Sequence, residues 1–323
     1  MLALVRTVPR LLAWIALGIA GASHAAFPEK PITLVVPFPS GGGTDATARL
    51  IASAVSPILG TNIVVENRAG AAGSIGAQFV ASAKPDGYTL FFTTTGALVI
   101  NPHLYKNLRY SVGDFTPIAP VGESANVLVV NPNLPVTSVK DLVELAKASP
   151  GKYTYGSSGV GSSSHLAGVV LESLTGVKLT HVPYKGSAPA VTDLVGGRID
   201  MMIDNIPSHV ELAKAGKVRP LGVSGTKTSP LFPGVPTIEQ AGVPGYDITI
   251  WYGILGPAGM PDQAVQKIAS AVRQAISRPE LQAKLVEIGS DPMIMLPQEF
   301  EAFIHKENEK WAGIVKQSGA NLQ

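Results

Sequence analysis

The sequence predicts an α/β fold built on parallel β-sheet. Short runs of β-branched and aromatic residues alternate with segments in which apolar residues recur at helical spacing. Strands that alternate with helices pair in parallel through right-handed crossovers. The 323 residues suffice for two domains or one large one, and an apolar content of 46% with only 15% charged residues excludes intrinsic disorder.

The first 25 residues are expected to be a targeting segment. Arg6 and Arg10 form a basic region, the apolar run LLAWIALGI follows, and small residues precede a cleavage site after Ala25. This is the pattern of a secretory signal peptide. A membrane anchor is the alternative, but the run is shorter than the roughly 20 residues that a membrane-spanning helix needs. We therefore expect a soluble periplasmic protein of a Gram-negative bacterium.

Composition and motifs exclude several classes of function. The 25 basic and 23 acidic residues give a net charge of +2, which is too small to indicate a nucleic-acid-binding protein. The absence of cysteine excludes disulfides, thiolate metal sites and a cysteine nucleophile. The sequence contains no H-x-x-x-H pair and no phosphate-binding G-x-x-x-x-G-K-[ST] loop, and GVGSSS at 159–164 fails the G-x-G-x-x-G pattern. We expect neither a metal nor another cofactor.

The first part of the chain is expected to fold as a βαβαβ unit. In order, its elements are a strand at 32–37, a helix from 45 that Gly60 ends, a strand at 62–66, a helix from 74 and a strand at 88–94. The run ITLVVP in the first strand is typical of a strand buried on both faces. The chain thus opens as a three-stranded parallel sheet.

The middle of the chain repeats this alternation, and the end becomes helical. Strands are expected at 127–130, 153–157, 178–182, 199–203, 218–223 and 248–255, and helices at 139–148, 163–174, 189–195, 261–277, 280–288 and 297–317. Ser138 and Asp141 form a capping-box variant at the start of the helix 139–148. No linker of biased composition separates the parts, so two lobes would be tightly coupled.

Four loops rich in glycine and hydroxyl residues lie at the carboxyl ends of predicted strands, at 37–45, 93–97, 156–165 and 184–189. In open α/β sheets the ligand lies at this end of the strands. A helix start presents free N–H groups and a positive dipole end, which favour an anion. One such loop alone could be an ordinary capped turn. Four loops together predict a small anionic ligand held mainly by N–H and hydroxyl donors.

A second hypothesis is a secreted hydrolase that uses Ser158 or Ser163 with His165. The G-x-S-x-G spacing is absent and no orienting acid can be placed, so a capping or packing role for His165 is the alternative. Asp204 follows a strand and has two open interpretations. It accepts a hydrogen bond from a ligand amine, hydroxyl or protonated carboxyl, or it caps a helix before Pro207.

Several segments resemble the Bug-type extracytoplasmic receptors of tripartite tricarboxylate transporters. They are FPEKPITLVVPFPSGGGTDATAR, VVENRAGAAGSIGA, AKPDGYTL, GSSGVGSSSHLAGVVLESLTG, HVPYKGSAPAVTDLVGGRIDMMIDN, VRPLGVSG and PGVPTIEQAGVP. The resemblance runs from about residue 27 to the C-terminus. It implies a type II periplasmic-binding-protein fold, with two α/β lobes joined by two crossing strands and a ligand cleft between them. By this resemblance lobe 1 comprises 26–124 plus 252–323 and lobe 2 comprises 125–251, with the crossings near 124–127 and 249–253.

The resemblance also implies the ligand and its contacts. The family binds small carboxylates (dicarboxylates, tricarboxylates, acidic amino acids or aromatic acids such as a phthalate) through backbone groups and bridging waters rather than through Arg. None of the four loops contains Arg, in agreement with this expectation. Carried over by motif, the ligand-binding residues are Phe38, Ser40, Gly41, Gly42, Gly43, Thr44, Asp45, Thr94, Thr95, Ser158, Gly161, Ser162, Ser163, Gly186, Ser187 and Asp204.

The implied activity is binding without catalysis. The lobes close around the ligand, and a two-component membrane permease recognises the closed form of a monomeric receptor. A receptor that serves a membrane sensor shares the same binding chemistry, so the sequence leaves that alternative open. Ser40 departs from the Pro or Ala that is common in the family and adds a hydroxyl near the ligand. Met201 and Met202 are expected in the core, and the residues do not distinguish one carboxylate from another.

Overall fold

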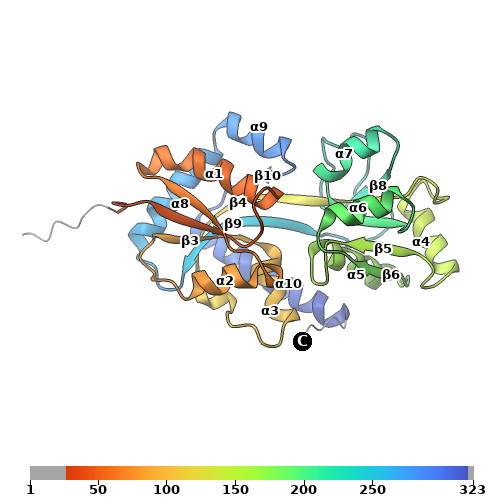
Figure 1. Cartoon of the computed structure of the whole chain (residues 1–323), viewed down its shortest axis with the longest axis horizontal. Coiled ribbons are helices and arrows are strands. Elements are labelled where there is room, and N and C mark those ends of the chain that lie inside the picture. The colour runs from red at the N-terminus through yellow and green to blue at the C-terminus, as the bar shows by residue number, and fades with distance from the viewer. Residues whose placement is uncertain (1–26, 319–323) are drawn as a thin grey trace, which may run out of the picture.

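The computed structural model describes residues 27–318. The predicted signal peptide lies outside the described residues. Two groups of strands and helices stand side by side and are connected by two long strands, as Figure 1 shows. We call the group that contains the N-terminal strands lobe 1 and the other lobe 2. This is the two-lobed α/β architecture with crossing strands that the sequence predicts.

Lobe 1 opens with three parallel strands, β1 (Ile32–Val36), β2 (Ile63–Asn67) and β3 (Thr89–Thr94). The first of these lies in the middle, because Leu34 is paired with Val65 on one side and with Leu90 on the other. Helices α1 (Gly43–Leu59) and α2 (Ser74–Ala81) make the crossovers, and the short helical segment Gly96–Ile100 with α3 (Asn101–Leu104) follows β3. The predicted βαβαβ unit is confirmed.

Lobe 2 repeats the arrangement with shorter strands. Its sheet contains β5 (Thr154–Ser157), β6 (Thr180–Pro183), β7 (Met201–Asn205) and β8 (Arg219–Val223). Its helices are α4 (Val139–Ala148), α5 (Ser163–Thr175), α6 (Ser187–Val195) and α7 (Pro207–Lys214). The strands β6, β5 and β7 are parallel neighbours, so their carboxyl ends meet at one edge.

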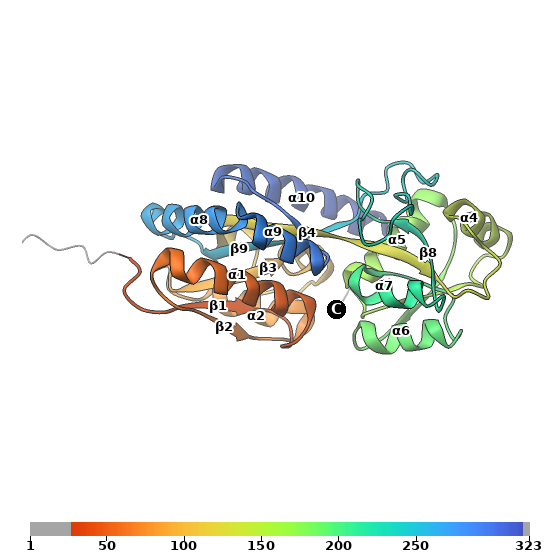
Figure 2. The same ribbon diagram turned by 90° about the horizontal axis from the view of Figure 1, so that it is seen from above.

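Two antiparallel strands belong to both lobes. β4 (Phe115–Val130) pairs with β9 (Thr249–Pro257) beside β3 in lobe 1, and its second half pairs with β7 and β8 in lobe 2. The two strands run side by side where the chain passes between lobes, with Ser124 opposite Ile250 and Ala125 opposite Thr249. This pairing places the crossing strands at the connection visible in both ribbon views (Figures 1 and 2).

The C-terminal helices return to lobe 1. They are α8 (Asp262–Ile276), α9 (Pro279–Glu287) and α10 (Pro297–Ser318), with the two-residue strand β10 (Asp291–Pro292) between the last two. α8 packs against α1, whereas α10 runs along β4 and reaches α5 of lobe 2 (Figure 2). No helix within residues 27–318 is both long enough and apolar enough to cross a membrane.

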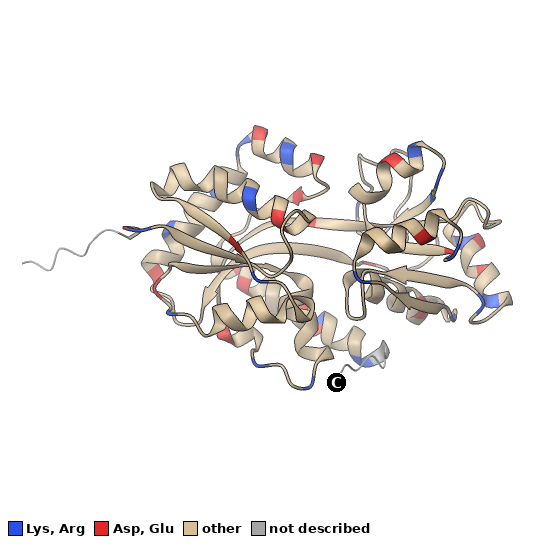
Figure 3. Ribbon diagram, in the orientation of Figure 1, with Lys and Arg blue, Asp and Glu red and all other residues tan. Residues whose placement is uncertain are grey.

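Three clusters of buried apolar side chains hold these layers together. One joins α1 and α8 to the lobe 1 sheet, a second lies under α6 and α7 in lobe 2, and the third extends across both lobes around α5 and α10. Met201 and Met202 are both fully buried in this packing, as predicted. Charged residues of both signs are scattered over the outer faces (Figure 3), which agrees with a chain of small net charge.

Two expectations from the sequence need correction. The strand predicted at 127–130 is only the end of β4, which begins twelve residues earlier at Phe115. Its register shifts at Pro117 and again at Pro120, because a proline has no N–H group for the sheet and is accommodated at bulges. Helix α7 was missing from the predicted helices and was expected only under the cap interpretation of Asp204, although Pro207 at its first position is a common helix start.

Candidate ligand-binding site

The loop between β1 and α1 is organised around the carboxylate of Asp45. The N–H group of Gly41 and Nε of Arg49 donate to its Oδ2 at 2.9 and 3.0 Å, and Nδ2 of Asn67 donates to its Oδ1 at 2.9 Å. The Asp45 side chain is only 4% exposed. Both oxygens are therefore engaged within lobe 1, and the residue fixes the path of the glycine loop.

The pKa of Asp45 reflects these contacts. Burial alone would raise it, but the hydrogen bonds from Arg49, Gly41 and Asn67, together with the charge of Arg49, lower the pKa from 3.8 to about 2. The carboxylate is thus ionised at any pH near neutrality. An ionised Asp45 in the first turn of α1 also complements the positive end of the helix dipole.

The start of α1 leaves backbone donors available. The N–H group of Ala46 donates to the carbonyl of Gly42 at 2.9 Å, but those of Gly43, Thr44 and Asp45 precede the first helical hydrogen bond and have no partner in residues 27–318. Gly43 is exposed and the Thr44 side chain is half-buried. This end of α1 lies on the side of lobe 1 that faces lobe 2 (Figure 1).

The predicted contacts after β3 are more constrained. Thr94 and Thr95 are 5% and 1% exposed. The Thr95 hydroxyl accepts the N–H group of Trp251 at 2.8 Å, and the Thr94 hydroxyl accepts that of Ala97 at 3.4 Å. The two threonines thus attach the helical segment 96–104 to β3 and to the crossing strand β9. Their hydroxyl groups hold the loop in place through hydrogen bonds to the backbone.

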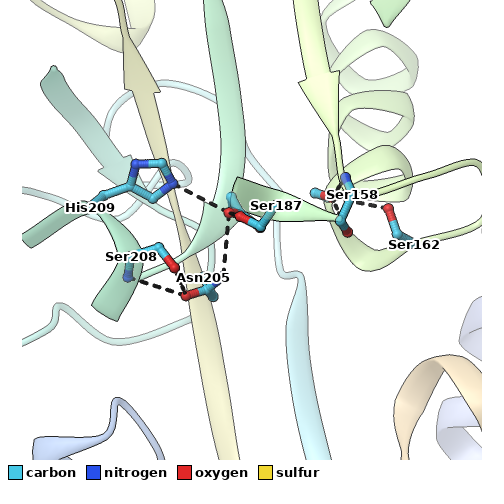
Figure 4. A network of polar contacts seen from close by, with 8 residues as sticks. Ser158, Ser162, Ser187, Asn205, Ser208 and His209 are labelled. Carbon is cyan, nitrogen blue, oxygen red and sulfur yellow. Dashed lines mark hydrogen bonds and ion pairs between the residues drawn. The ribbon is translucent and has the colours of Figure 1, made fainter. Parts of the chain in front are cut away.

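The serine-rich loop of lobe 2 forms a network at the start of α5. The Ser162 hydroxyl caps the helix by accepting the N–H group of His165 at 3.3 Å and donates to the carbonyl of Gly159 at 2.7 Å. The N–H group of Ser158 donates to Oγ of Ser164 at 2.9 Å, and the two hydroxyls are 3.1 Å apart (Figure 4). The N–H groups of Ser163 and Ser164 have no partner among the described residues.

His165 has a packing role, which was one of its two predicted interpretations. Its ring lies 4.1 Å from that of His181, and the rings of Tyr155 and His181 stack at 4.8 Å. Its Nδ1 accepts the N–H group of Gly161 at 3.1 Å. Burial lowers the pKa of His165, and burial with the neighbouring His165 lowers the pKa of His181 to about 4.

The hydrolase hypothesis gains no support from this geometry. Neither Ser158 nor Ser163 is hydrogen bonded to His165, although nucleophile and base must lie within hydrogen-bond reach. Within residues 27–318, the serine side chain that meets a histidine ring is Ser157, whose Oγ lies 2.7 Å from Nε2 of His181. Ser157 is fully buried at the end of β5.

The third loop brings Ser187 to Asp204. The hydroxyl of Ser187, the first residue of α6, donates to Oδ2 of Asp204, and Gly186 donates its N–H group to the carbonyl of Ser158 at 3.2 Å. Asp204 lies within β7 rather than after it. Its Oδ2 also accepts Nδ2 of Asn205 at 3.3 Å, and Nε2 of His209 lies at 3.4 Å (Figure 4). The cap interpretation is wrong for Asp204, because the N–H group of Ser208 in the first turn of α7 donates to the neighbouring Asn205 at 3.2 Å.

The sequence prediction missed a fifth loop on this side of lobe 1. Residues 70–74 connect β2 to α2, and a Cβ added at Gly73 would lie 3.0 Å from Ala97 and 3.6 Å from Phe38. Ala71 and Ala72 have φ of 47° and 52°, a conformation that costs energy for residues other than glycine. Asn101 holds the loop by donating to the carbonyl of Ala72 at 2.9 Å. The glycine-rich run AGAAGS was the available signal.

Known proteins match nearly the whole chain in sequence or in structure. Protein BugT of Bordetella pertussis is 35% identical over 322 residues, which cover 97% of this chain and 99% of that protein. The structure described as R. palustris Rpa4515 with adipate superimposes with a TM-score of 0.82 and 40% identity, over 91% of this chain and 98% of that one.

A further solved structure, MatC (Rpa3494) from Rhodopseudomonas palustris with bound malate, gives a TM-score of 0.78 at 31% identity and covers 90% of this chain and 100% of that chain. Residues 47–320 match the family described as Tripartite tricarboxylate transporter family receptor. That match includes both crossing strands, the serine-rich loop and the C-terminal helix. It makes this chain a member of the TctC family of tripartite tricarboxylate transporter receptors.

Proposed function

We propose that the protein is an extracytoplasmic solute receptor that binds a small carboxylate between its lobes and delivers it to the membrane permease of a tripartite tricarboxylate transporter. The observation that carries the proposal is the pair of helix starts, α1 in lobe 1 and α5 in lobe 2, whose first N–H groups have no partner within residues 27–318. A carboxylate accepts several such hydrogen bonds and is favoured by the positive ends of the two helix dipoles.

This mode of binding needs no cationic side chain. The loops that carry Gly43, Thr44, Ser158 and Ser163 contain neither Arg nor Lys, so the charge of the ligand is compensated by N–H and hydroxyl dipoles. Hydrogen bonds from neutral donors to a charged group contribute about 1.5–3 kcal/mol each. Water bridges add contacts at little cost where a direct hydrogen bond does not reach.

Closure of the lobes couples binding to recognition by the permease. A ligand that contacts α1 and α5 at once binds the closed form better than the open form and shifts the equilibrium toward it. β4 and β9, paired at Ser124–Ile250, are suited to act as the hinge. We place the lobe boundaries there, at 124/125 and 251/252.

The relatives support the carboxylate class. One solved structure contains adipate and another malate, both dicarboxylates, on chains that are 40% and 31% identical to this one. A monomeric receptor, a periplasmic location and export through a signal peptide cleaved after Ala25 complete the proposal. The ligand contacts are Phe38, Ser40 to Thr44, Ser158, Gly161 to Ser163, Gly186, Ser187 and Asp204, with Asp45, Thr94 and Thr95 holding the loops.

A thermal-shift screen of residues 26–323 tests this function. Ligands that bind the folded state alone raise the melting temperature by mass action, so one subclass in a panel of carboxylates, amino acids and sugars should raise it. The protein should first be unfolded in denaturant and refolded, which removes a ligand carried through purification. A shift with sugars or esters and none with any carboxylate would contradict the proposal.

A further inference from the structure

We infer that the preferred ligand carries a hydrogen-bond donor, a hydroxyl or an ammonium group, beside its carboxylate, and that Asp204 and Ser187 select it. This inference rests on the proposed carboxylate receptor and names the subclass of its ligand. It comes from counting hydrogen-bond donors and acceptors in the Ser187–Asp204 cluster, which comprises Ser187, Asp204, Asn205 and His209 (Figure 4).

The contacts of Asp204 converge on one of its two oxygens. Oδ2 accepts the hydroxyl of Ser187 and Nδ2 of Asn205, and Nε2 of His209 lies 3.4 Å away. Oδ1 has no hydrogen-bond partner among the described residues. The Asp204 carboxyl group therefore keeps one oxygen with unused acceptor capacity.

The hydroxyl group of Ser187 has no proton to spare for a ligand. A serine hydroxyl has a single proton, and that of Ser187 is directed at Asp204, so the Ser187 oxygen presents only lone pairs to a ligand. The Asn205 amide is partly engaged, since Nδ2 donates one proton to Asp204 and Oδ1 accepts both the N–H group and the hydroxyl of Ser208, at 3.2 and 2.7 Å. The second Nδ2 proton has no partner among the described residues. Ser187 and Asp204 thus accept hydrogen bonds from a ligand and offer it none.

The burial of Asp204 makes an additional partner favourable. The residue is 4% exposed, and no Lys or Arg of residues 27–318 lies within 4 Å of its carboxyl oxygens. The remaining neighbour is His209, which is itself fully buried and has no hydrogen bond at either ring nitrogen. A buried carboxylate is stable only when its oxygens are hydrogen bonded, so a ligand donor at Oδ1 would add a missing contact.

The starts of α1 and α5 offer hydrogen-bond donors, whereas Ser187 and Asp204 offer acceptors. Unpaired N–H groups lie at Gly43 and Thr44 of α1, and at Ser163 and Ser164 of α5. A hydroxy- or amino-carboxylate satisfies both kinds of surface, with its carboxylate on N–H groups and its donor on the Ser187–Asp204 cluster. A ligand without a donor leaves Asp204 unsatisfied, and a second carboxylate placed there is repelled by it.

Matched ligand pairs test the inference on the wild-type protein. Calorimetric titration with succinate, malate and aspartate, and with adipate and 2-aminoadipate, compares ligands that differ by one donor group. A hydrogen bond to a charged group predicts that the donor-bearing member binds about tenfold more tightly or better in at least one series. Equal or weaker binding of the donor-bearing members in both series would overturn the inference and leave the carboxylate receptor intact.

Two variants connect the preference to the cluster. Asp204→Asn should reduce the preference to less than about threefold, and Ser187→Ala should weaken it while removing no charge. Asp193→Asn is the matched control, since Asp193 is a lobe 2 carboxylate bound by Tyr184 and Arg198 outside the cluster. If folded Asp204→Asn still prefers the donor-bearing ligands as strongly as the wild type, the inference is contradicted. If Asp204→Asn does not fold, the same outcome in Ser187→Ala contradicts it. Failure of every carboxylate to bind the wild type would instead refute the proposed function with it.

Discussion

Trp251 and Trp311 donate their indole N–H groups to the same oxygen, Oε2 of Glu307, at 3.1 and 3.2 Å. Trp251 belongs to the crossing strand β9, and the other two residues belong to α10. Lys310, on the next turn of α10, lies 3.5 Å from the second oxygen of Glu307 and 3.1 Å from Asp247, which precedes β9. One buried carboxylate thus joins the C-terminal helix to the connection between the lobes.

Replacement of Glu307 by Ala should destabilise the protein strongly. The change leaves two buried indole donors unpaired, and each unpaired donor costs about 1–3 kcal/mol, so the free energy of unfolding should fall by about 2–6 kcal/mol. Urea unfolding followed by tryptophan fluorescence measures the effect. Glu309→Ala removes an exposed carboxylate from the same helix and serves as the control. Equal stability of the two variants would show that the shared carboxylate contributes nothing.

A large side chain at Gly42 should abolish carboxylate binding without unfolding the protein. A Cβ at Gly42 meets nothing closer than the Pro39 carbonyl at 3.8 Å, so Gly42→Leu is tolerated while its side chain covers the start of α1. We expect at least a hundredfold loss of affinity by calorimetric titration. Gly313→Leu on α10, where a Cβ also meets no atom within 4 Å, is the matched control. Unchanged affinity in Gly42→Leu would remove the β1–α1 loop from the site.

Asp45→Ala should make the protein less stable at neutral pH by about 2 kcal/mol, since the wild-type pKa of about 2 lies below the unfolded value of 3.8. A depressed pKa contributes stability above the unfolded value, and that contribution is lost as the pH falls toward 2. The difference in unfolding free energy between wild type and variant should therefore shrink between pH 4 and pH 2. Glu301→Ala, on the exposed side of α10, should show no such dependence.

The stacked histidines predict a second loss of stability in acid. The pKa of His181 is lowered from 6.5 to about 4, so the unfolded chain binds a proton in this interval that the folded protein does not. The contribution is complete above pH 6.5 and declines as the pH falls to 4, by about 1–3 kcal/mol for this partly buried ring. His181→Gln should flatten the stability profile between these values. His305→Gln alters an exposed histidine and serves as the control. If the stability of His181→Gln depended on pH as steeply as that of His305→Gln, the loss of stability in acid would not come from His181.

Local signals in the sequence were sufficient for most of the fold. Gly60 ends α1 with a φ of 72°, and the Ser138–Asp141 capping box forms as predicted, because both depend on residues within one turn. The length of β4 was missed because Pro117 and Pro120 look like strand breakers until the antiparallel partner β9, far along the chain, is known. The length of β4 is set by its pairing with a strand more than a hundred residues away, which local sequence signals do not reveal.

The candidate site could also be predicted only in part. Glycine and hydroxyl residues marked the loops, but the sequence does not say which hydroxyls remain free. Thr95 is engaged by Trp251, which lies 156 positions along the chain, and Ser187 by Asp204. Asp45 has the loop position of a ligand contact, yet its oxygens are held by Gly41, Arg49 and Asn67. Whether a polar side chain binds a ligand or another residue of the protein can be read only from the folded structure.

The path of β9 also sets the order in which the molecule is completed. β3 has its antiparallel neighbour only after all of lobe 2 has been synthesised, and α8 and α10 cover lobe 1 later still. A nascent chain that ends before Thr249 carries the three parallel strands of lobe 1 with the β3 edge unpaired in addition to the β2 edge, and with an apolar face uncovered. Exposed edges of this kind associate with other chains. The N-terminal half therefore depends on its own C-terminus for protection, and a truncated copy is an aggregation hazard rather than a smaller receptor.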